Sequence, residues 1–353
     1  EDGLDLVVLG TMGDVQPLVD ENRILAWMGL ERLRSGTLRP GMQALLDAAG
    51  LRNEAVQSRP VGFRMVPRLN AAGRVARGKL AVDLLLAGDG ATASRLAWEL
   101  ELQNQRRRQL SEFAEAGARE QAARVWQDSK PPALALASET WHPGVIGIAA
   151  ARLAETYGVP VALVAYQNGM GRGSVRTSGG VDVRAALEAA GEVLVKFGGH
   201  REACGLTLEP ERFEAFRELF TAAVARQRPD ALQPSLQIEE ELTQEDLEGG
   251  LMEALERLEP FGPGHPEPFF LVRGMRAGSR TRVVGKGHLK LHLQLADGNP
   301  LDGIAFGWGR DVTPAQVVGK QIDAVGQVRR QDPRYGNACQ LVVADMRAHA
   351  PRG

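Results

Sequence analysis

Residues 161–200 read VALVAYQNGM GRGSVRTSGG VDVRAALEAA GEVLVKFGGH. Apolar and β-branched runs predict strands over Val161–Ala165 and Gly173–Thr177, separated by a glycine-rich turn. A helical pattern follows over Val181–Lys196 and leads into Gly198-Gly199-His200. Strands that alternate with a helix in this way are typical of an α/β unit.

The same pattern continues on both sides of this stretch and covers residues 132–228. A strand over Ala133–Ala137 and a helix over Val145–Tyr157 are predicted before it. A strand around Gly205–Leu208 and a helix over 210–226 are predicted after it. The middle of the chain is therefore predicted to form a complete α/β unit.

The part of the chain before this unit is predicted to be mostly helical. The run Leu4–Gly10 is rich in β-favouring residues and predicts a strand, followed by a loop over Thr11–Leu18. Because a domain rarely begins on a central strand, we expect the chain to start within a fold. Residues 20–90 alternate helical patterns with breakers, and residues 91–126 predict one long helix, polar on much of its surface, that bridges two domains.

The C-terminal part has a different pattern. From about residue 268 to 347, short alternating strands are separated by Gly and Asp turns, which favours a small β-barrel of the oligonucleotide-binding type. The predicted strands are Leu289–Leu295, Leu301–Gly307, Gln321–Val328 and Ala338–Asp345. The predicted fold is therefore α/β with a C-terminal all-β barrel.

Composition and charge narrow the class of protein. The 353 residues are 44% hydrophobic and 24% charged, as in globular proteins of two or three domains. No apolar run approaches the roughly 18 residues needed to span a bilayer, and the N-terminal residues lack a secretion-signal pattern. Cys204 and Cys339 lie far apart in the sequence, which favours buried thiols in a reducing cytoplasm over a zinc site or disulfides.

The net charge of −2 conceals a strong segregation of charge. Residues 237–260 contain nine acids and one base, whereas residues 271–330 contain ten bases and four acids. A polyanion responds to the local field rather than to the charge of the whole chain. The C-terminal part therefore remains a candidate for binding nucleic acid.

Two motifs of the α/β unit predict a site for phosphate groups. Ser174 and Arg176 are two residues apart on a predicted strand, so that hydroxyl and guanidinium point to the same face. Gly198 and Gly199 allow close approach of the backbone to an anion, and His200 adds a ring nitrogen. The alternatives are the polar face of an edge strand for the first motif and a glycine cap ending the preceding helix for the second.

Three further motifs carry candidate site residues. Asp14 follows a predicted strand, where α/β enzymes place metal ligands, but its spacing alone favours a residue that caps a turn or helix. Asn70 and Arg74, with Arg68, offer donors on one loop-to-helix segment or form an ordinary solvated surface. His142 precedes a helix start that could receive a phosphate oxygen, or it merely caps that helix.

The predicted barrel combines basic and aromatic residues, the combination by which proteins hold single strands. The basic residues are Arg280, Arg282, Lys286, His288 and Lys290, and the aromatic residues are Phe306, Trp308 and Tyr335. The alternative is that the aromatic rings fill the barrel while the charges keep it solvated. For Phe306 we favour the core, whereas for the charges and Trp308 we favour contact with DNA.

Taken in order, these motifs resemble the RecJ exonucleases of the DHH phosphoesterase superfamily over nearly the whole chain. The matching segments are Gly10–Leu18, Gly62–Arg74, Trp141–Gly147, Gly173–Arg176, Gly198–His200 and Leu258–Pro268. The resemblance implies that residues 1–90 are the C-terminal part of a DHH catalytic domain and residues 91–126 a connecting helix. It also implies a DHH-associated substrate-binding domain over 127–230 and an oligonucleotide-binding barrel over 235–349.

The resemblance also implies roles for individual residues. Asp14 would be the last metal-binding carboxylate of a centre holding two Mn²⁺ or Mg²⁺ ions, and Asp14 and His200 would be catalytic. Substrate would be bound by Ser174, Arg176, Gly198, Gly199, Arg74, Asn70 and His142. The family's Asp-x-Asp and Asp-His-His motifs do not occur in this sequence, so we expect them upstream of Glu1, in a longer protein of which this chain is the C-terminal portion.

The implied activity is metal-dependent 5′→3′ hydrolysis of single-stranded DNA to mononucleotides, in DNA repair and recombination. The implied partner is single-stranded DNA, with a single-strand-binding protein and a helicase as candidate protein partners, no membrane, and a monomeric state. One alternative is an oligonucleotide or cyclic-dinucleotide phosphodiesterase of the same superfamily, which would not need the basic barrel. Another is a non-catalytic scaffold that binds single strands.

Overall fold

The computed structural model describes residues 3–51, 56–227, 235–331 and 339–349. The chain divides into two compact units, which we call the barrel unit and the sheet unit. The barrel unit comprises Glu1–Ser35, Val56–Val61 and Pro234–Gly353, and the sheet unit comprises Gly36–Ala55 and Gly62–Gln233. The mixed α/β class with a C-terminal barrel is confirmed. The expected domain boundaries near residues 90, 126 and 230 stay predictions.

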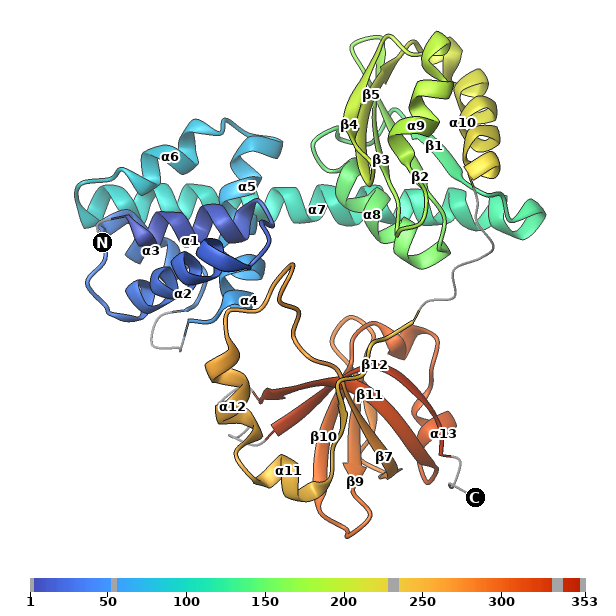
Figure 1. Ribbon diagram of the computed structural model, residues 1–353. Coiled ribbons are helices and arrows are strands. Elements are labelled where there is room, and N and C mark those ends of the chain that lie inside the picture. The colour runs from blue at the N-terminus through green and yellow to red at the C-terminus, as the bar shows by residue number, and fades with distance from the viewer. Residues whose placement is uncertain (1–2, 52–55, 228–234, 332–338, 350–353) are drawn as a thin grey trace. The chain divides into compact units, whose positions relative to one another are not determined.

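The sheet unit is built on a five-stranded sheet with the order β1-β2-β3-β5-β4 (Figure 1). Its strands are β1 Leu134–Ser138, β2 Val161–Gln167, β3 Met170–Arg176, β4 Lys196–His200 and β5 Ala203–Leu208. Strands β1 and β2 are parallel, and every other pair is antiparallel. Strands β1 and β2 are largely buried, whereas β3, β4 and β5 alternate between buried and accessible residues. Alternation of this kind marks a sheet with one face open.

Helices cover the two faces of this sheet unequally. Helices α9 Val183–Ala189 and α10 Phe213–Gln227 pack on one face, where Phe216 and Phe220 are fully buried in a core that includes residues of β1, β2, β3 and β5. On the other face, α8 Ile146–Tyr157 packs over β2 and β3, and the second half of α7 packs beside β1. The part of this face formed by β5 and β4, together with part of β3, therefore retains accessible positions.

Helix α7, Gly90–Ser129, is the long helix that the sequence predicts over residues 91–126. Its N-cap residue is Asp89, whose side chain accepts a hydrogen bond from the Thr92 amide at 2.8 Å. Its buried stripe is mostly alanine, which allows neighbouring helices to approach closely. Those neighbours are α3 Pro40–Ala48, α5 Val66–Val75, α6 Lys79–Leu85 and α8. Among the helices of the described residues, none has both the length and the apolar character needed to span a membrane.

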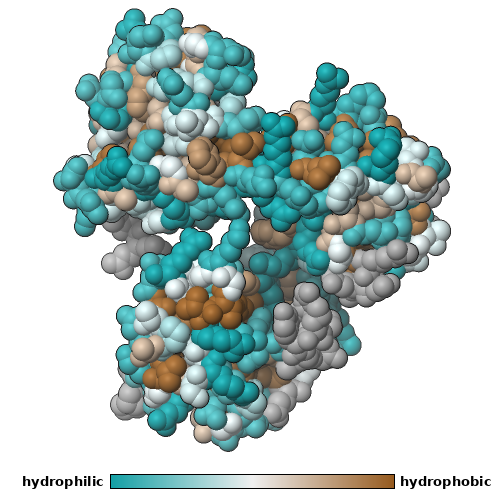
Figure 2. All heavy atoms as spheres, turned by 180° about the vertical axis from the view of Figure 1, so that it is seen from behind, coloured by the Kyte–Doolittle hydropathy of each residue, from teal (hydrophilic) through white to brown (hydrophobic). Residues whose placement is uncertain are grey.

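The barrel unit contains a seven-stranded sheet with the order β6-β7-β11-β12-β10-β9-β8, which closes through pairing of β7 with β9. The strands are β6 Glu240–Glu241, β7 Phe270–Ala277, β8 Arg282–Val284, β9 His288–Gln294, β10 Pro300–Ala305, β11 Gln321–Arg330 and β12 Cys339–Ala348. Inward-facing Leu289, Leu291 and Leu293 fill its interior. The predicted barrel is thus confirmed, and Figure 2 shows a band of apolar residues on its otherwise mostly hydrophilic visible surface.

The segment Leu258–Pro268 connects the helices of the barrel unit to its strands. Glu259 accepts hydrogen bonds from the amide and hydroxyl of Ser58, at 3.3 and 2.6 Å, and the Phe261 amide donates to the same hydroxyl at 3.2 Å. The Leu18 amide donates to the Pro263 carbonyl at 2.6 Å. Backbone and side-chain bonds therefore hold three distant parts of the sequence in one unit.

The N-terminal strand prediction is wrong, because residues Leu4–Gly13 form helix α1. This helix packs against α2, Asp20–Arg34, at Gly29, where a Cβ atom would lie 2.6 Å from the Cβ of Val8. The β-branched residues of this segment favour a strand only weakly, and burial of Val8 and Leu9 against a neighbouring helix outweighs that preference.

The prediction of one helix over Val181–Lys196 is also partly wrong. Helix α9 ends at Ala189, a short 3₁₀ turn covers Gly191–Val193, and Lys196–His200 is strand β4. Gly198-Gly199-His200 therefore lies within a strand and does not cap a helix. The β-branched Val193 and Val195 and the pairing with β5 explain why the helix is not continued.

One buried carboxylate joins three strands of the barrel. Asp323 on β11 accepts hydrogen bonds from the Gly274 amide at 3.0 Å, from His349 Nδ1 at 2.6 Å and from Arg273 at 3.2 Å. Burial acts to raise the pKa of Asp323, but the bonds from His349 and Gly274 and the neighbouring positive charges lower it overall. The ionised carboxylate is thus part of the folded barrel.

We expect the stability of the barrel unit to fall in acid. Because the folded-state pKa of Asp323 is depressed, its contribution is present above the ordinary value of about 4 and is lost as the pH falls through the folded-state pKa. The Asp323→Asn variant should lose about 3 kcal/mol at pH 7 and should show a weaker acid dependence. Urea unfolding of both proteins between pH 3 and pH 7 measures this, and parallel pH profiles would contradict the assignment.

Candidate nucleic-acid interface

Three antiparallel strands of the sheet unit present one open face. Directly paired residues of neighbouring strands point to the same side of a sheet. The β3–β5–β4 register therefore gives three rows across this face, which are Arg172–Thr207–Lys196, Ser174–Gly205–Gly198 and Arg176–Ala203–His200. Polar and basic side chains thus surround a centre that has two glycines and no bulky side chain.

Gly198 and Gly199 differ in why a glycine occupies the position. A Cβ atom added to Gly198 would meet nothing within 4 Å, so its missing side chain leaves free space above the sheet. Gly199 has a φ of +139°, and a Cβ atom there would lie 2.4 Å from the Ala203 carbonyl oxygen. Gly199 is therefore needed for the path of the backbone, whereas Gly198 forms a flat floor.

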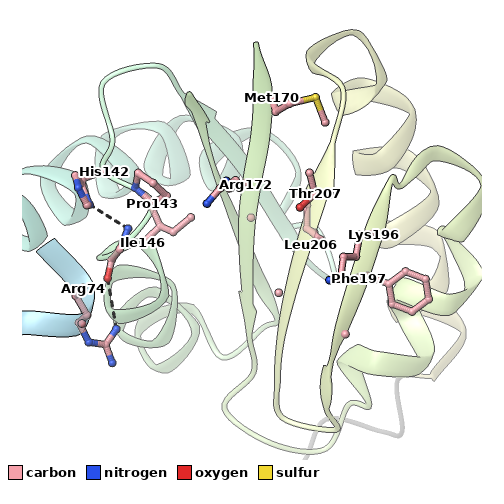
Figure 3. A pocket seen from close by; sticks show the side chains of 15 residues that line it. Arg74, His142, Pro143, Ile146, Met170, Arg172, Lys196, Phe197, Leu206 and Thr207 are labelled. Carbon is pink, nitrogen blue, oxygen red and sulfur yellow. Dashed lines mark hydrogen bonds between the residues drawn. The ribbon is translucent and has the colours of Figure 1, made fainter. Parts of the chain in front are cut away.

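A groove with a volume of about 720 Å³ lies over this floor. Figure 3 shows Arg74 and His142 on one side of it and Lys196 and Thr207 on the other. Its remaining lining includes Pro143, Gly144, Ile146, Met170, Arg172 and Gly205. Groove residues thus come from α5, from the turn before α8 and from strands β3, β4 and β5.

Gly144 fixes the turn before α8 against helix α5. A Cβ atom at Gly144 would lie 2.1 Å from the Arg74 carbonyl oxygen, so only glycine allows this approach. His142 Nδ1 accepts a hydrogen bond from the Gly144 amide at 3.0 Å, and Arg74 donates to the Gly144 carbonyl at 3.5 Å. His142 therefore caps this turn, and its other ring nitrogen is not used by that bond.

Arg176 and Ser174 lie together at one end of the open face, as their spacing predicts. Arg176 Nη1 donates to Ser174 Oγ and to the Val175 carbonyl, both at 2.8 Å. A Cβ atom at Gly147 of α8 would lie 3.0 Å from the guanidinium, so the helix start packs closely over it. Burial lowers the pKa of Arg176, and the charge of Arg74 lowers it further.

Sequence reasoning missed Arg107, on the central part of α7. Its Nη2 donates to Asn104 Oδ1 at 3.1 Å, while its Nε is buried without a hydrogen-bond partner among the described residues. Burial lowers the pKa of Arg107 most. The charges of four other arginines lower it further, and Arg74 has the largest effect among them. The sequence shows three consecutive arginines at 106–108 but does not show which one points inward.

Arg107, Arg74 and Arg176 share one electrostatic property. Within the part of the chain that the structure describes, no carboxylate lies within ion-pair distance of any of them, and their hydrogen-bond acceptors are neutral. By contrast, the nearby Arg68 forms an ion pair with Glu101 at 2.7 Å. An anion in this region would therefore meet positive charge that the protein itself does not neutralise.

Other predicted site residues lie around this groove or apart from it. His200 is exposed at the end of β4, in the same row as Arg176. Asn70 is exposed on α5 and does not line the groove, and Arg68 is turned toward Glu101. Lys196 and Arg172, which line it, were not predicted from the sequence.

Comparison with known proteins agrees with this architecture. Residues 130–226 match the family model described as the DHHA1 domain, and residues 238–345 match the RecJ OB domain. Curated single-stranded-DNA-specific exonucleases RecJ from Dickeya dadantii and Escherichia coli are 38% and 37% identical to it, over 96% of this chain. The one from Salmonella typhimurium is 35% identical over 97% of this chain. The chain is homologous to the RecJ exonucleases.

Solved structures give the same relationship. RecJ from Thermus thermophilus in complex with Mg²⁺ superimposes with a TM-score of 0.81 at 31% identity, covering 99% of this chain and 52% of that one. Its complex with Mn²⁺ gives 0.81 at 32%, covering 99% and 50%. The chain spans about 60% of the length of the curated RecJ relatives from Salmonella, Dickeya and Escherichia.

The described residues do not fit a divalent metal centre of the kind bound in those structures. The prediction that Asp14 follows a strand is wrong, because Asp14 is the exposed C-cap residue of helix α1. Its backbone amide donates to the Gly10 carbonyl at 3.0 Å, which agrees with the capping alternative, and its carboxylate accepts a hydrogen bond from the Gln16 side chain at 2.6 Å. No three His, Cys, Asp or Glu side chains within the described ranges are placed to hold a metal ion.

The basic residues predicted in the barrel lie at or near its β8–β9 hairpin. Arg282 and Lys290 are directly paired across β8 and β9, Arg280 contacts His292, and Lys290 lies 3.6 Å from Asp302. Lys286 is in the turn between the two strands. Trp308 is half-buried and packs against the barrel core, so its contact with DNA stays a prediction, whereas the core assignment is wrong for Phe306, which is 55% exposed. Tyr335 lies outside the described residues.

The two central glycines give a matched pair of variants. We expect Gly198→Ala to fold normally, because its methyl group enters free space, and to weaken binding of single-stranded DNA by narrowing the groove. Gly199→Ala should lose about 1–3 kcal/mol of stability, because alanine rarely adopts its backbone conformation. Thermal unfolding and fluorescence anisotropy with a labelled 15-mer distinguish the two effects, and unchanged binding by Gly198→Ala would exclude a role for the floor.

Proposed function

We propose that this chain is the strand-holding part of a metal-dependent exonuclease that degrades single-stranded DNA from its 5′ end to mononucleotides, in DNA repair and recombination. One observation carries the proposal: three guanidinium groups without carboxylate partners lie beside a glycine-floored groove in a chain homologous to RecJ. A polyanion is the ligand that such a site attracts.

Arg74, which lines the groove, and Arg176 and Arg107, which lie outside its lining, would act on the backbone of the strand. Arg176, held by Ser174, would donate two parallel hydrogen bonds to one phosphate group, and Arg74 and Arg107 would attract neighbouring phosphates. The floor at Gly198 and Gly205 would let a sugar or base approach the sheet. Contacts of this kind position a strand without reading its sequence, as an exonuclease requires.

His142 and His200 would complete the two ends of this surface. His142 belongs to the turn that also holds Arg74, and His200 shares a row with Arg176. Each could donate a ring N–H to a phosphate oxygen or hold a proton near one. A two-ion Mn²⁺ or Mg²⁺ centre would need ligands from beyond the described residues, and we therefore derive no step through it.

The barrel would hold the strand beyond the groove. Its basic hairpin supplies phosphate contacts, which make binding depend on salt. A cyclic-dinucleotide phosphodiesterase would have no use for this surface. A single-strand-binding protein and a helicase as partners, a monomeric state and a cytoplasmic location are part of the same proposal.

Arg176→Ala should weaken binding of a 5′-phosphorylated 15-mer by about 10- to 100-fold, because a charged hydrogen-bond donor to phosphate is lost. Arg176→Lys should restore only part of the affinity, since a lysine cannot form the two-fold contact. Arg217→Ala is the matched control, because Arg217 pairs with Glu214 on helix α10, on the helix-covered side of the sheet. Fluorescence anisotropy measures all three variants, and equal losses for Arg176→Ala and Arg217→Ala would contradict a specific site.

The activity itself is tested by Mn²⁺-dependent release of mononucleotides from 5′-phosphorylated single-stranded DNA, with the intact mass of the purified protein measured in parallel. We expect the 38.1 kDa chain to bind the strand without hydrolysing it, because its described residues hold no metal centre. A longer protein that contains this chain should release mononucleotides. Failure of the longer protein to hydrolyse the strand would favour a non-catalytic scaffold.

A further inference from the structure

Phe306 is an exposed aromatic residue on the barrel, directly after strand β10. Its side chain is 55% exposed, although its neighbour Ala305 is fully buried in the barrel interior. The ring forms a T-shaped contact with His288, with centroids 5.2 Å apart and planes at 79°. The Phe306 ring is therefore accessible to solvent and at the same time in contact with a second ring.

The strand register explains why Phe306 points outward. Strands β9 and β10 are antiparallel neighbours (Figure 1), with Leu289 opposite Ala305 and Leu291 opposite Gly303. These residues face the interior, so the alternate residues His288 and Lys290 face outward. Phe306 follows Ala305 and therefore joins His288 on the outer face.

The local backbone fixes this aromatic pair. His288 Nδ1 accepts a hydrogen bond from the Gly307 amide at 3.0 Å, and Gly307 has a φ of +84°, which glycine adopts without strain. The bond determines the position of the imidazole, and the T-shaped contact then determines the tilt of the Phe306 ring. The ring is thus prepositioned while much of its surface remains accessible to solvent.

Basic side chains share this outer face. Lys290 is directly opposite Arg282 on β8 and opposite Ile304 on β10, one row away from the His288 and Phe306 pair. Arg310 packs over the turn at Gly287, where a Cβ atom would lie 2.9 Å from its Cγ. A prepositioned aromatic ring beside a row of cations is the arrangement by which single strands are held through stacked bases and neutralised phosphates.

We propose that Phe306 is a base-stacking residue for single-stranded nucleic acid on the outer face of β8, β9 and β10. Its ligand is an unpaired base of any sequence, while Arg282 and Lys290 bind the adjoining phosphates. This inference rests on the proposed function, to which it adds the residue that contacts bases. It assigns to Phe306 the role that the sequence suggested for Trp308, whose ring packs against the core.

The test uses the full 353-residue chain and two labelled 15-mers, oligo-dT and an abasic deoxyribose-phosphate strand of the same length. We expect Phe306→Ala to weaken binding of oligo-dT by roughly 5- to 150-fold and to leave binding of the abasic strand unchanged. The slope of log Kd against log salt should not change, because no phosphate contact is lost. Phe306→Tyr should retain affinity for oligo-dT.

Two controls separate stacking from other effects. Phe113→Ala removes a phenylalanine of similar exposure, 57%, from helix α7 of the sheet unit and should not change the affinity. Lys290→Gln should weaken both strands and reduce the salt slope by about 0.7, the value for one contact to a single strand. Thermal unfolding of each variant verifies that the barrel is folded.

The outcomes distinguish this inference from the proposed function. If Phe306→Ala binds oligo-dT like the parent chain, or loses equal affinity for both strands, then Phe306 does not stack on bases and the inference is overturned. In that case Arg176→Ala can still weaken binding of the 5′-phosphorylated strand, and the proposed function stands. If the parent chain binds no single strand at all, both are overturned.

Discussion

Positive charge that the protein does not itself neutralise is the constraint on which the arrangement of the sheet unit depends. Arg176 donates to a hydroxyl and to carbonyl groups, Arg74 to a carbonyl, and Arg107 to an amide oxygen. A guanidinium that is partly removed from water and has only neutral partners is less stable than one paired with a carboxylate. A bound anion would offset this cost, and the glycines of the open face leave room for one.

The barrel unit also contains charged residues, but they differ in whether they are buried or exposed. Asp323 is buried in the barrel and forms hydrogen bonds to Gly274 and His349, so this charge stabilises the fold. Arg282, Lys290 and Phe306 lie instead on the outer face, where a ligand can reach them. In the proposed function, the groove would hold phosphates and the outer face of the barrel would contact bases. Both kinds of contact would be independent of sequence.

Several elements of the fold could be predicted from the sequence because their signals are local. The absence of proline over 40 residues predicts helix α7, and alternating short segments with glycine turns predict the barrel strands. The prediction failed at Leu4–Gly13, where packing against Gly29 of α2 outweighs a weak strand preference. It failed again at the end of the helix predicted over Val181–Lys196, where a 3₁₀ turn and the start of β4 replace the last helical residues. Pairing of β4 with β5 is a contact that a local helical pattern does not show.

By itself, the sequence determined the fold class, the i, i+2 pairing of Ser174 with Arg176 and the segregation of charge, because these depend on residue type and short spacing. Only the tertiary structure decided which residues face a ligand. In the structure, Arg107 Nε is buried and Asp14 lies at the end of a helix. Trp308 packs against the core, and Phe306 is exposed. The physical reason is that exposure depends on strand register and on helix contacts between distant segments, and a shift of one residue in a strand exchanges the two faces.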